Sequence, residues 1–237
     1  MKRFICVFIL TVVLFTAKST SLGTEKFDPD FYAGQNPDVV EVFGTNPEAL
    51  YAHYITYGKT EGRLPYEEAV DIPVERLGDT DDDVNDEIIR QLSYVPDKLK
   101  TCFIKAGYTL YHTSEDVAQT EFSGKYKSVR GVTNYTGKYI KIHDRMVAAR
   151  TAVCHEFGHI LYSMAGRFDG NGLEEVISAF GQEKENYGQA LSGTNGLDNH
   201  MEFYAEVFFL YCHDRVKACD LYPVVSGLIE SDLAALD

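Results

Sequence analysis

Residues 151–161 constrain this chain more than any other stretch, because they carry two histidines four positions apart among small and apolar residues. If the stretch is helical, His155 and His159 lie one above the other on the same face. Two imidazoles so placed can hold one Zn²⁺ ion. Glu156 then lies beside the metal without binding it, where its carboxylate can take a proton from a metal-activated water. The stretch therefore predicts a helix that carries two ligands and the base of a zinc hydrolase.

The N-terminus has the three parts of a secretory signal peptide. Lys2 and Arg3 supply the positive start, residues 4–15 the apolar run, and Ala17-Lys18-Ser19 a small-x-small cleavage site. The run is shorter than the roughly 20 apolar residues that a membrane-spanning helix needs, and no later stretch is apolar enough to span a bilayer. We therefore expect residues 1–20 to be cleaved and the mature protein to be secreted and extracellular, without membrane insertion.

The chain is acidic, with 36 Asp and Glu against 22 Lys and Arg and a net charge of −14. Cleavage would remove Lys2, Arg3 and Lys18, so that the 22 basic side chains become 19 and the net charge becomes −17. Nucleic acid and anionic membrane surfaces would be repelled by this charge. We therefore expect no nucleic-acid partner, and the charge suits a basic or neutral substrate.

Four cysteines remain after the signal peptide, and their spacing fits no cysteine-based zinc pattern. An even number in an exported protein permits disulfides, but four thiols allow three pairings and the sequence does not choose among them. The cysteines are Cys102, Cys154, Cys212 and Cys219. Cys154 adjoins His155, and we expect it to be a small buried apolar residue rather than a ligand or a bridge partner.

Residues 27–66 differ in composition from the rest of the chain, with many aromatic residues and two Asn-Pro pairs. Asn36 and Asn46 can cap short helices, and Pro37 and Pro47 then fall in first turns, where a missing N–H is harmless. The pattern predicts a small helical module. The segment resembles a short module that recurs in exported bacterial proteins, a resemblance that assigns no function. We expect a spacer, with contact to the cell envelope as the alternative.

Residues 67–83 read as a linker, and residues 84–237 as the main domain. Hydrophobic spacing predicts helices over 84–93, 96–107, 145–164, 173–180 and from 199 onward, and strands over 108–112, 128–133 and 139–143. Asp144 suits the N-cap of the helix that bears the two histidines. The same spacing directs Ile104 and Val147 to the core. This order predicts an α+β domain with a small mixed sheet and a mainly helical C-terminal part.

A third protein ligand is required for a zinc site with an open position for water. In the helix that begins near Asn199, Glu202 and Glu206 are four positions apart and share a face. Glu202 could instead be a capping partner of Asn199, and Glu206 could lie on a solvated face. The aromatic residues around them predict a buried helix, however, and a buried carboxylate is costly without a cation or a donor. We therefore assign Glu202 to the metal and Glu206 to orienting a ligand histidine.

The two motifs together, His155-Glu156-Phe157-Gly158-His159 and residues 202–208, resemble the lethal-factor-like zinc metallopeptidases, the family that includes the Pro-Pro endopeptidases. The resemblance covers roughly residues 85–220. It implies a zincin-like fold, one zinc ion on His155, His159 and Glu202, and Glu156 as the general base. It also implies an edge strand that pairs with an extended peptide. By position, that strand falls within residues 129–134.

The chain departs from this family at one position. Family members carry a tyrosine seven residues before the glutamate ligand, where its hydroxyl can stabilise the oxyanion, and this chain has Asn195 there. Tyr187 is the displaced equivalent if the loop is longer, and His200 is the rival candidate. An aromatic residue at position 187 could equally be an ordinary surface or core residue.

The expected function is that of a secreted zinc metalloendopeptidase of the gluzincin type, which combines HExxH with a downstream glutamate. Glu156 would take a proton from the metal-activated water and pass it to the leaving amine, with an extended peptide or protein as substrate. The alternative is an inactive zincin domain that binds extracellular peptides by strand addition. The sequence indicates neither the natural substrate nor a preference for proline at the cut site.

Overall fold

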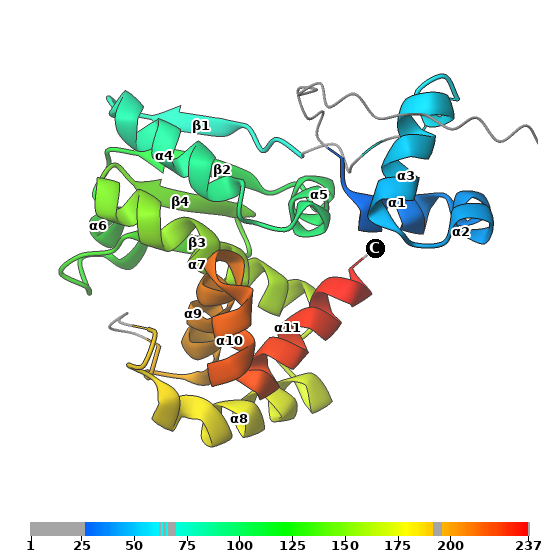
Figure 1. Ribbon diagram of the computed structural model, residues 1–237. Coiled ribbons are helices and arrows are strands. Elements are labelled where there is room, and N and C mark those ends of the chain that lie inside the picture. Colours follow the sequence, from blue (N-terminus) through cyan, green and yellow to red (C-terminus); the bar gives the residue numbers. More distant parts are fainter. Residues whose placement is uncertain (1–26, 62, 64, 66–69, 192–195, 237) are drawn as a thin grey trace, which may run out of the picture. The chain divides into compact units, whose positions relative to one another are not determined.

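The computed structural model describes residues 27–61, 63, 65, 70–191 and 196–236. The expected signal peptide, residues 1–20, lies outside this part of the chain, and so does Asn195. The chain divides into two compact units, Met1–Glu68 and Ala69–Asp237. Figure 1 labels their helices and strands. No helix within the described ranges is both long and apolar enough to cross a membrane.

The smaller unit is built from short helices that begin at proline. They are α1 (Pro29–Gln35), α2 (Pro37–Phe43) and α3 (Pro47–His53), followed by the π-helical turn η1 (Tyr54–Gly58). Pro37 and Pro47 occupy first turns, as expected. The Asn46 side chain accepts a hydrogen bond from the Ala49 N–H (3.0 Å) and caps α3. Asn36 makes no such cap, and its amide instead donates to the Tyr32 carbonyl (2.7 Å).

Tyr32, Val39, Leu50 and Tyr54 form the core of the smaller unit. Arg63, which follows η1 in the chain, contacts α2 by donating to both carboxylate oxygens of Asp38, at 2.9 and 2.8 Å. This planar two-point contact fixes geometry as well as charge. The unit therefore has a hydrophobic core of its own.

The larger unit combines helices with one small sheet, which confirms the expected α+β class. Its strands are β1 (Val74–Leu77), β2 (Thr109–Thr113), β3 (Gly131–Asn134) and β4 (Tyr139–His143). Its helices are α4 (Asp82–Leu92), α5 (Asp97–Lys105), α6 (Val117–Phe122), α7 (Met146–Met164), α8 (Gly170–Glu183), α9 (His200–His213), α10 (Arg215–Leu221) and α11 (Pro223–Ala235), with the 3-10 turn η2 (Lys184–Asn186) after α8.

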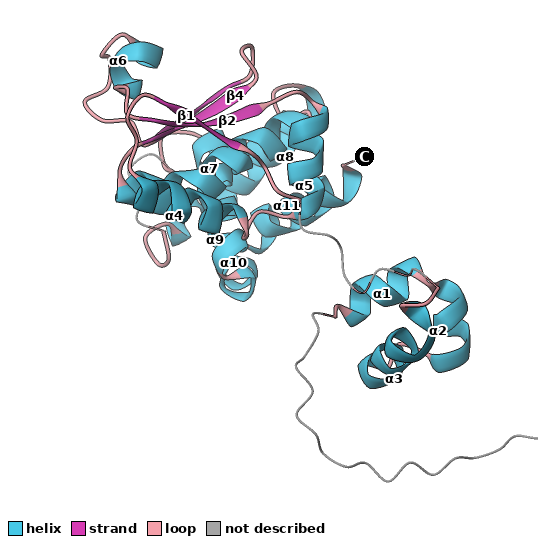
Figure 2. Ribbon diagram, turned by 90° about the horizontal axis from the view of Figure 1, so that it is seen from above, coloured by secondary structure: helices cyan, strands magenta, loops and turns pink. Residues whose placement is uncertain are grey.

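The sheet has the strand order β1-β2-β4-β3. Strands β1, β2 and β4 run parallel, and β3 pairs antiparallel with β4 at the edge. Leu110, Ile140 and Ile142 point into the hydrophobic core beneath the sheet. Figure 2 shows α4 and α7 on one side of the sheet and α6 on the other. Strand β3 therefore has one edge that pairs with no described strand, and it lies against α7.

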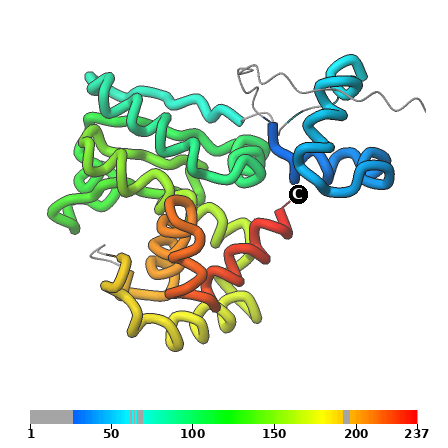
Figure 3. The backbone as a smooth tube through the Cα atoms, viewed as in Figure 1, coloured from blue at the N-terminus to red at the C-terminus, as the bar shows by residue number. Residues whose placement is uncertain are grey.

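Helix α7 is the centre of the larger unit, because it contacts the sheet, α4, α9 and α11. The chain path in Figure 3 runs from the sheet through α7 into the C-terminal helices, coloured yellow to red. Helices α7 and α9 approach closely at Gly158, where an added Cβ would lie only 2.8 Å from the Ala205 Cα. A small residue at this position therefore lets the two helices pack.

Two sequence expectations need correction at the start of the larger unit. The range 67–83, expected to be a linker, contains strand β1, which pairs with β2. It also contains the start of α4, whose N-cap is Asp81. Strand β1 is short and half exposed, so its sequence lacks the alternation that marks a strand, and pairing with β2 gives it that conformation.

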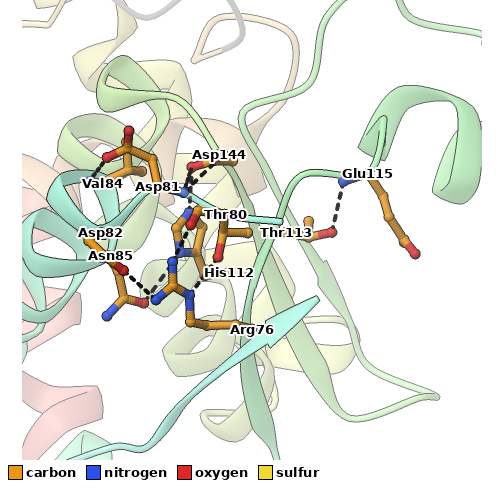
Figure 4. A network of polar contacts seen from close by, with 10 residues as sticks. All are labelled: Arg76, Thr80, Asp81, Asp82, Val84, Asn85, His112, Thr113, Glu115 and Asp144. Atoms are coloured by element: carbon orange, nitrogen blue, oxygen red, sulfur yellow. Dashed lines mark hydrogen bonds and ion pairs between the residues drawn. The ribbon is translucent and has the colours of Figure 1, made fainter. Parts of the chain in front are cut away.

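Asp144 is not the N-cap of α7, as the sequence suggested. Arg145 holds that position, without a side-chain hydrogen bond. The Asp144 carboxylate instead lies 2.8 Å from Nε2 of the buried His112 and accepts from the Asp81 N–H at 3.2 Å (Figure 4). It thereby joins the ends of β2 and β4 to the start of α4.

Two apolar side chains expected in the core are exposed: Ile104 by 44% and Val147 by 49%. Each lies on the outer side of its helix, because both helices pack over a narrower face than the sequence spacing indicated. Cys154 is buried as expected, and its thiol donates to the Gln91 carbonyl. All four cysteines of the larger unit are described, and none of them forms a disulfide.

Candidate metal centre

Helices α7 and α9 bring three candidate ligands together. His155 and His159 come from α7 and Glu202 from α9, and one ligand atom from each lies within 4.8 Å of the others. Within the described ranges, no other cluster of three or more His, Cys, Asp or Glu side chains has the spacing of a metal site. The His155 and His159 rings meet edge to face with centroids 4.8 Å apart. The spacing of four along a helix therefore places both imidazoles on one face, as expected from the sequence.

The start of α9 fixes the third candidate ligand. The Asn199 side chain caps this helix by accepting from the N–H groups of Met201 (2.9 Å) and Glu202 (3.0 Å). The Glu202 carboxylate is thus free to point at α7. Its Oε2 lies 3.3 Å from His155 Nε2, and its Oε1 lies 3.6 Å from His159 Nε2.

Glu206 lies one turn further along α9, behind His155. Its Oε1 is 3.4 Å from His155 Nδ1, so the two nitrogens of this imidazole face two different carboxylates. Such a carboxylate fixes the orientation of a ligand imidazole and raises its basicity. Phe203, Tyr204, Val207 and Phe208 are all fully buried, as the sequence predicted for this helix.

The two histidines have opposite pKa shifts. Burial alone would lower the pKa of His155, but its hydrogen bonds to Glu202 and Glu206 outweigh burial and raise it to about 10. Burial lowers the pKa of His159 to about 3, and the positive charge on His155 contributes to this shift. For Glu202, burial would raise the pKa, yet the bond to His155 leaves it lowered. Burial therefore favours the neutral form of His159, whereas the two carboxylates favour the protonated form of His155.

This donor set fits a divalent metal ion. Two imidazoles and one carboxylate suit zinc, and a site with three protein ligands leaves a fourth position for water or substrate. His159 Nδ1 is buried and has no hydrogen-bond partner in the described part of the chain. A cation between the three groups would replace the proton on His155 and offset the buried negative charge.

Glu156 lies next to the candidate ligands and is buried, with 5% of its surface exposed. Burial raises its pKa to about 7, although the His155 charge and Thr133 act in the opposite direction. Thr133, on the edge strand β3, donates its hydroxyl to Glu156 Oε2 at 2.7 Å. An added Cβ on Gly131 would lie 2.8 Å from Glu156 Oε1, so the strand leaves room for this carboxylate.

The two candidates for stabilising an oxyanion already have partners. The ring of Tyr187 packs against Phe203, with centroids 6.1 Å apart, and its hydroxyl is bonded to the Gly196 backbone. His200 Nδ1 lies 3.1 Å from the Tyr162 hydroxyl, with the two rings stacked. Neither geometry identifies the stabilising group.

Thr133 was not predicted from the sequence as part of the site. The alternation of side chains along a strand could have indicated it in principle, because every second residue lies on the same face. Its use required knowing that β3 lies against α7 beside Glu156, a contact between residues that are 23 positions apart.

The fold has a counterpart among solved structures. The structure of the Pro-Pro endopeptidase PPEP-2 from Paenibacillus alvei matches this chain with a TM-score of 0.50 at 15% sequence identity. The match covers 67% of this chain and 96% of that one. At this identity the likeness extends to the fold. No family model matches the sequence, and neither does any curated protein sequence.

Proposed function

We propose that this chain is a secreted zinc metalloendopeptidase of the gluzincin type, with a zincin-like catalytic domain. The observation that carries the proposal is the convergence of His155, His159 and Glu202 within 4.8 Å, beside the buried carboxylate of Glu156. The likeness to a Pro-Pro endopeptidase fold supports peptide bonds as the target. The candidate signal peptide in residues 1–20 supports secretion.

His155, His159 and Glu202 would hold the zinc ion, and Glu206 would orient His155. When bound, a zinc ion supplies a Lewis acid that polarises the scissile carbonyl and makes water more acidic. Glu156 takes a proton from the attacking water as the water oxygen bonds to the carbonyl carbon. It then passes this proton to the amide nitrogen as the carbon–nitrogen bond breaks, which yields a carboxylic acid and an amine. The new acid then loses its proton to the amine or to solvent.

The substrate would bind as an extended strand. The edge of β3 that no described strand occupies can pair with a peptide through backbone hydrogen bonds. Thr133 on this strand contacts Glu156, so a peptide paired there would run past the base. The net charge of −14 is compatible with neutral or basic sequences.

The test combines two variants with a diverse peptide mixture and zinc. We expect the wild-type protein to generate new termini, Glu156→Ala to keep one zinc per chain without cleavage, and His159→Ala to lose the zinc. Mass spectrometry reports the cleavage, and metal analysis reports the zinc. Retained cleavage by purified Glu156→Ala would contradict the mechanism. Peptide complexes without new termini in the wild type would instead favour the inactive binding domain.

A further inference from the structure

The residue that follows strand β3 brings a second functional group next to α9, beside the candidate ligand Glu202. Gly131 and Thr133 have the same parity, and both contact Glu156. Asn134 faces away, since its amide donates to the Tyr139 hydroxyl. Tyr135 follows directly as the first residue of the turn between β3 and β4. Continued alternation would place its side chain on the face of the strand that lines the site.

The contacts of Tyr135 agree with this direction. Its hydroxyl lies 3.9 Å from the Met201 Sδ, beside the candidate ligand Glu202. Its ring meets the Phe168 ring edge to face with centroids 5.2 Å apart. A thioether is a weak acceptor, so this hydroxyl can turn to a stronger one without a large loss. The Phe168 ring meanwhile limits where the Tyr135 ring can lie.

The charges around Tyr135 keep its hydroxyl protonated. Burial raises its pKa, and the carboxylates of Glu156 and Glu202 raise it further. A tyrosine in this state is a hydrogen-bond donor at neutral pH. The side chain is therefore influenced by the charges of both the general base and a candidate metal ligand. Among the described residues, its hydroxyl has the weak Met201 thioether as its acceptor.

We propose that the Tyr135 hydroxyl donates a hydrogen bond to the carbonyl oxygen of the scissile peptide as negative charge develops there. This inference rests on the proposed peptidase function and adds a catalytic residue to it. Tyr135 keeps its proton throughout, because the proton of the attacking water goes to Glu156 and then to the leaving nitrogen. A donor aimed at developing charge stabilises the transition state more than the bound substrate. Tyr135 thus has the role that the family resemblance assigns to a tyrosine at position 195, where this chain has asparagine.

The kinetic test uses Tyr135→Phe in the full-length zinc-loaded protein, with a peptide that the wild type cleaves. This variant keeps the ring and removes only the hydroxyl. We expect kcat to fall about 100-fold with KM changed about twofold or less. The matched control is Tyr111→Phe on β2, whose side chain lies on the face of the sheet away from α7. Its kcat and KM are expected to stay at wild-type values.

A binding measurement separates a catalytic role from a structural one. A phosphinic peptide with the cleaved sequence mimics the tetrahedral state, and calorimetry should give an affinity for Tyr135→Phe about 10-fold or more below that for wild type. The uncleaved peptide should bind Glu156→Ala and the double variant Glu156→Ala, Tyr135→Phe equally well. Zinc content and Tm are expected to be unchanged.

Three outcomes overturn the inference. In the first, Tyr135→Phe has the kcat of the wild type and its affinity for the phosphinic peptide. This result would contradict the inference and leave the proposed function intact. Lost zinc or a lowered Tm in this variant would assign Tyr135 a structural role. Absence of cleavage by the wild type itself would remove the proposed function, and the inference with it.

Discussion

Thr133 and Glu156 make the shortest contact between the edge strand and the candidate base. The hydroxyl of Thr133 donates to Glu156 Oε2 at 2.7 Å and also lies 3.2 Å from the Glu156 carbonyl. A donor to a carboxylate favours the ionised form, and this is the form that can accept a proton from water. Burial acts in the opposite direction and raises the pKa of Glu156 to about 7. The balance of the two effects sets the fraction of Glu156 that is ionised at neutral pH and can act as a base.

Replacement of Thr133 by valine tests this balance. Thr133→Val keeps the shape and removes the donor, so the pKa of Glu156 should rise by roughly one pH unit. The base must be ionised, so kcat/KM should fall more at pH 6 than at pH 8, and its acid limb should move to higher pH. Thr133→Ser keeps the hydroxyl and should retain the wild-type profile. An acid limb at the same pH in wild type and Thr133→Val would contradict the assigned contact.

At the level of single residues, the relation between neighbouring positions could be predicted from the sequence, whereas contacts between distant positions could not. His155, Glu156 and His159 could be placed from the sequence, because a helix fixes residues four apart on one face. Glu202 could be proposed from the cost of burying a carboxylate. Thr133 and Tyr135 could not be found in this way, because their relation to Glu156 depends on how an edge strand packs against a helix.

Among the elements, α7 and α9 depend on one glycine for their close packing. An added Cβ at Gly158 would lie 2.8 Å from the Ala205 Cα and 3.1 Å from the Phe208 Cβ. The first of these atoms is backbone and cannot move without shifting the helix. Helix α9 carries Glu202 and Glu206, so its position relative to α7 decides whether the candidate ligands meet.

Gly158→Ala should therefore destabilise the protein by about 1–3 kcal/mol and weaken zinc binding. The matched control is Gly181→Ala on α8, where an added Cβ has nothing within 4 Å. That change should stabilise the helix by about 0.5–1 kcal/mol. Chemical denaturation and zinc titration of both variants measure the two effects. Equal stability of the two variants would mean that the helices do not pack as described.

Helix α11 is held to α7 and α9 by a buried ion pair. Arg167, three residues beyond the end of α7, donates to Asp232 Oδ1 at 2.6 Å and to Oδ2 at 3.1 Å. The Tyr204 hydroxyl on α9 donates to the same carboxylate at 2.7 Å. Arg167 and Asp232 expose only 6% and 5% of their surface. Arg167 also pairs with Glu175, whose side chain is 56% exposed. Removing Asp232 leaves the buried Arg167 with only this exposed carboxylate partner, and it leaves the Tyr204 hydroxyl without its acceptor.

Asp232→Ala is expected to lower the free energy of unfolding by about 3–5 kcal/mol. A second ion pair on α11 provides the control: Glu230 accepts from Arg215 at 2.6 Å, and the two side chains are 42% and 64% exposed. Glu230→Ala should cost about 1 kcal/mol or less, because exposed pairs contribute little. Thermal and denaturant unfolding distinguish the two variants. Similar losses from both would contradict the burial of the Arg167–Asp232 pair.

The sequence predicted helices and strands most accurately where their hydrophobic pattern extended over many residues. The range of α7 was predicted to within a residue or so, and the pairs of helices and strands before it follow the expected order. Strand β1 was assigned to a linker because four half-exposed residues carry no pattern of their own. The Arg167–Asp232 pair joins positions that are 65 apart, and no sequence spacing predicts such a contact.

For the whole molecule, the division into two units separates the site from the N-terminal helices. All the candidate site residues belong to Ala69–Asp237, which has its own hydrophobic core. A protein that begins at residue 70 should therefore cleave peptides with kcat/KM within about twofold of the full chain. Steady-state kinetics on both forms checks this. A large loss on truncation would assign residues 27–66 a part in substrate binding rather than the expected spacer role.

Zinc titration tests whether a single ion on His155, His159 and Glu202 supports peptide hydrolysis. Purified full-length protein is stripped with a chelator and titrated with zinc, and cleavage of a peptide substrate is measured at each addition. We predict no cleavage in the stripped protein, a linear return of activity that ends at one zinc per chain, and no return in Glu202→Ala. Full cleavage by the stripped protein, or full recovery in Glu202→Ala, would contradict the account.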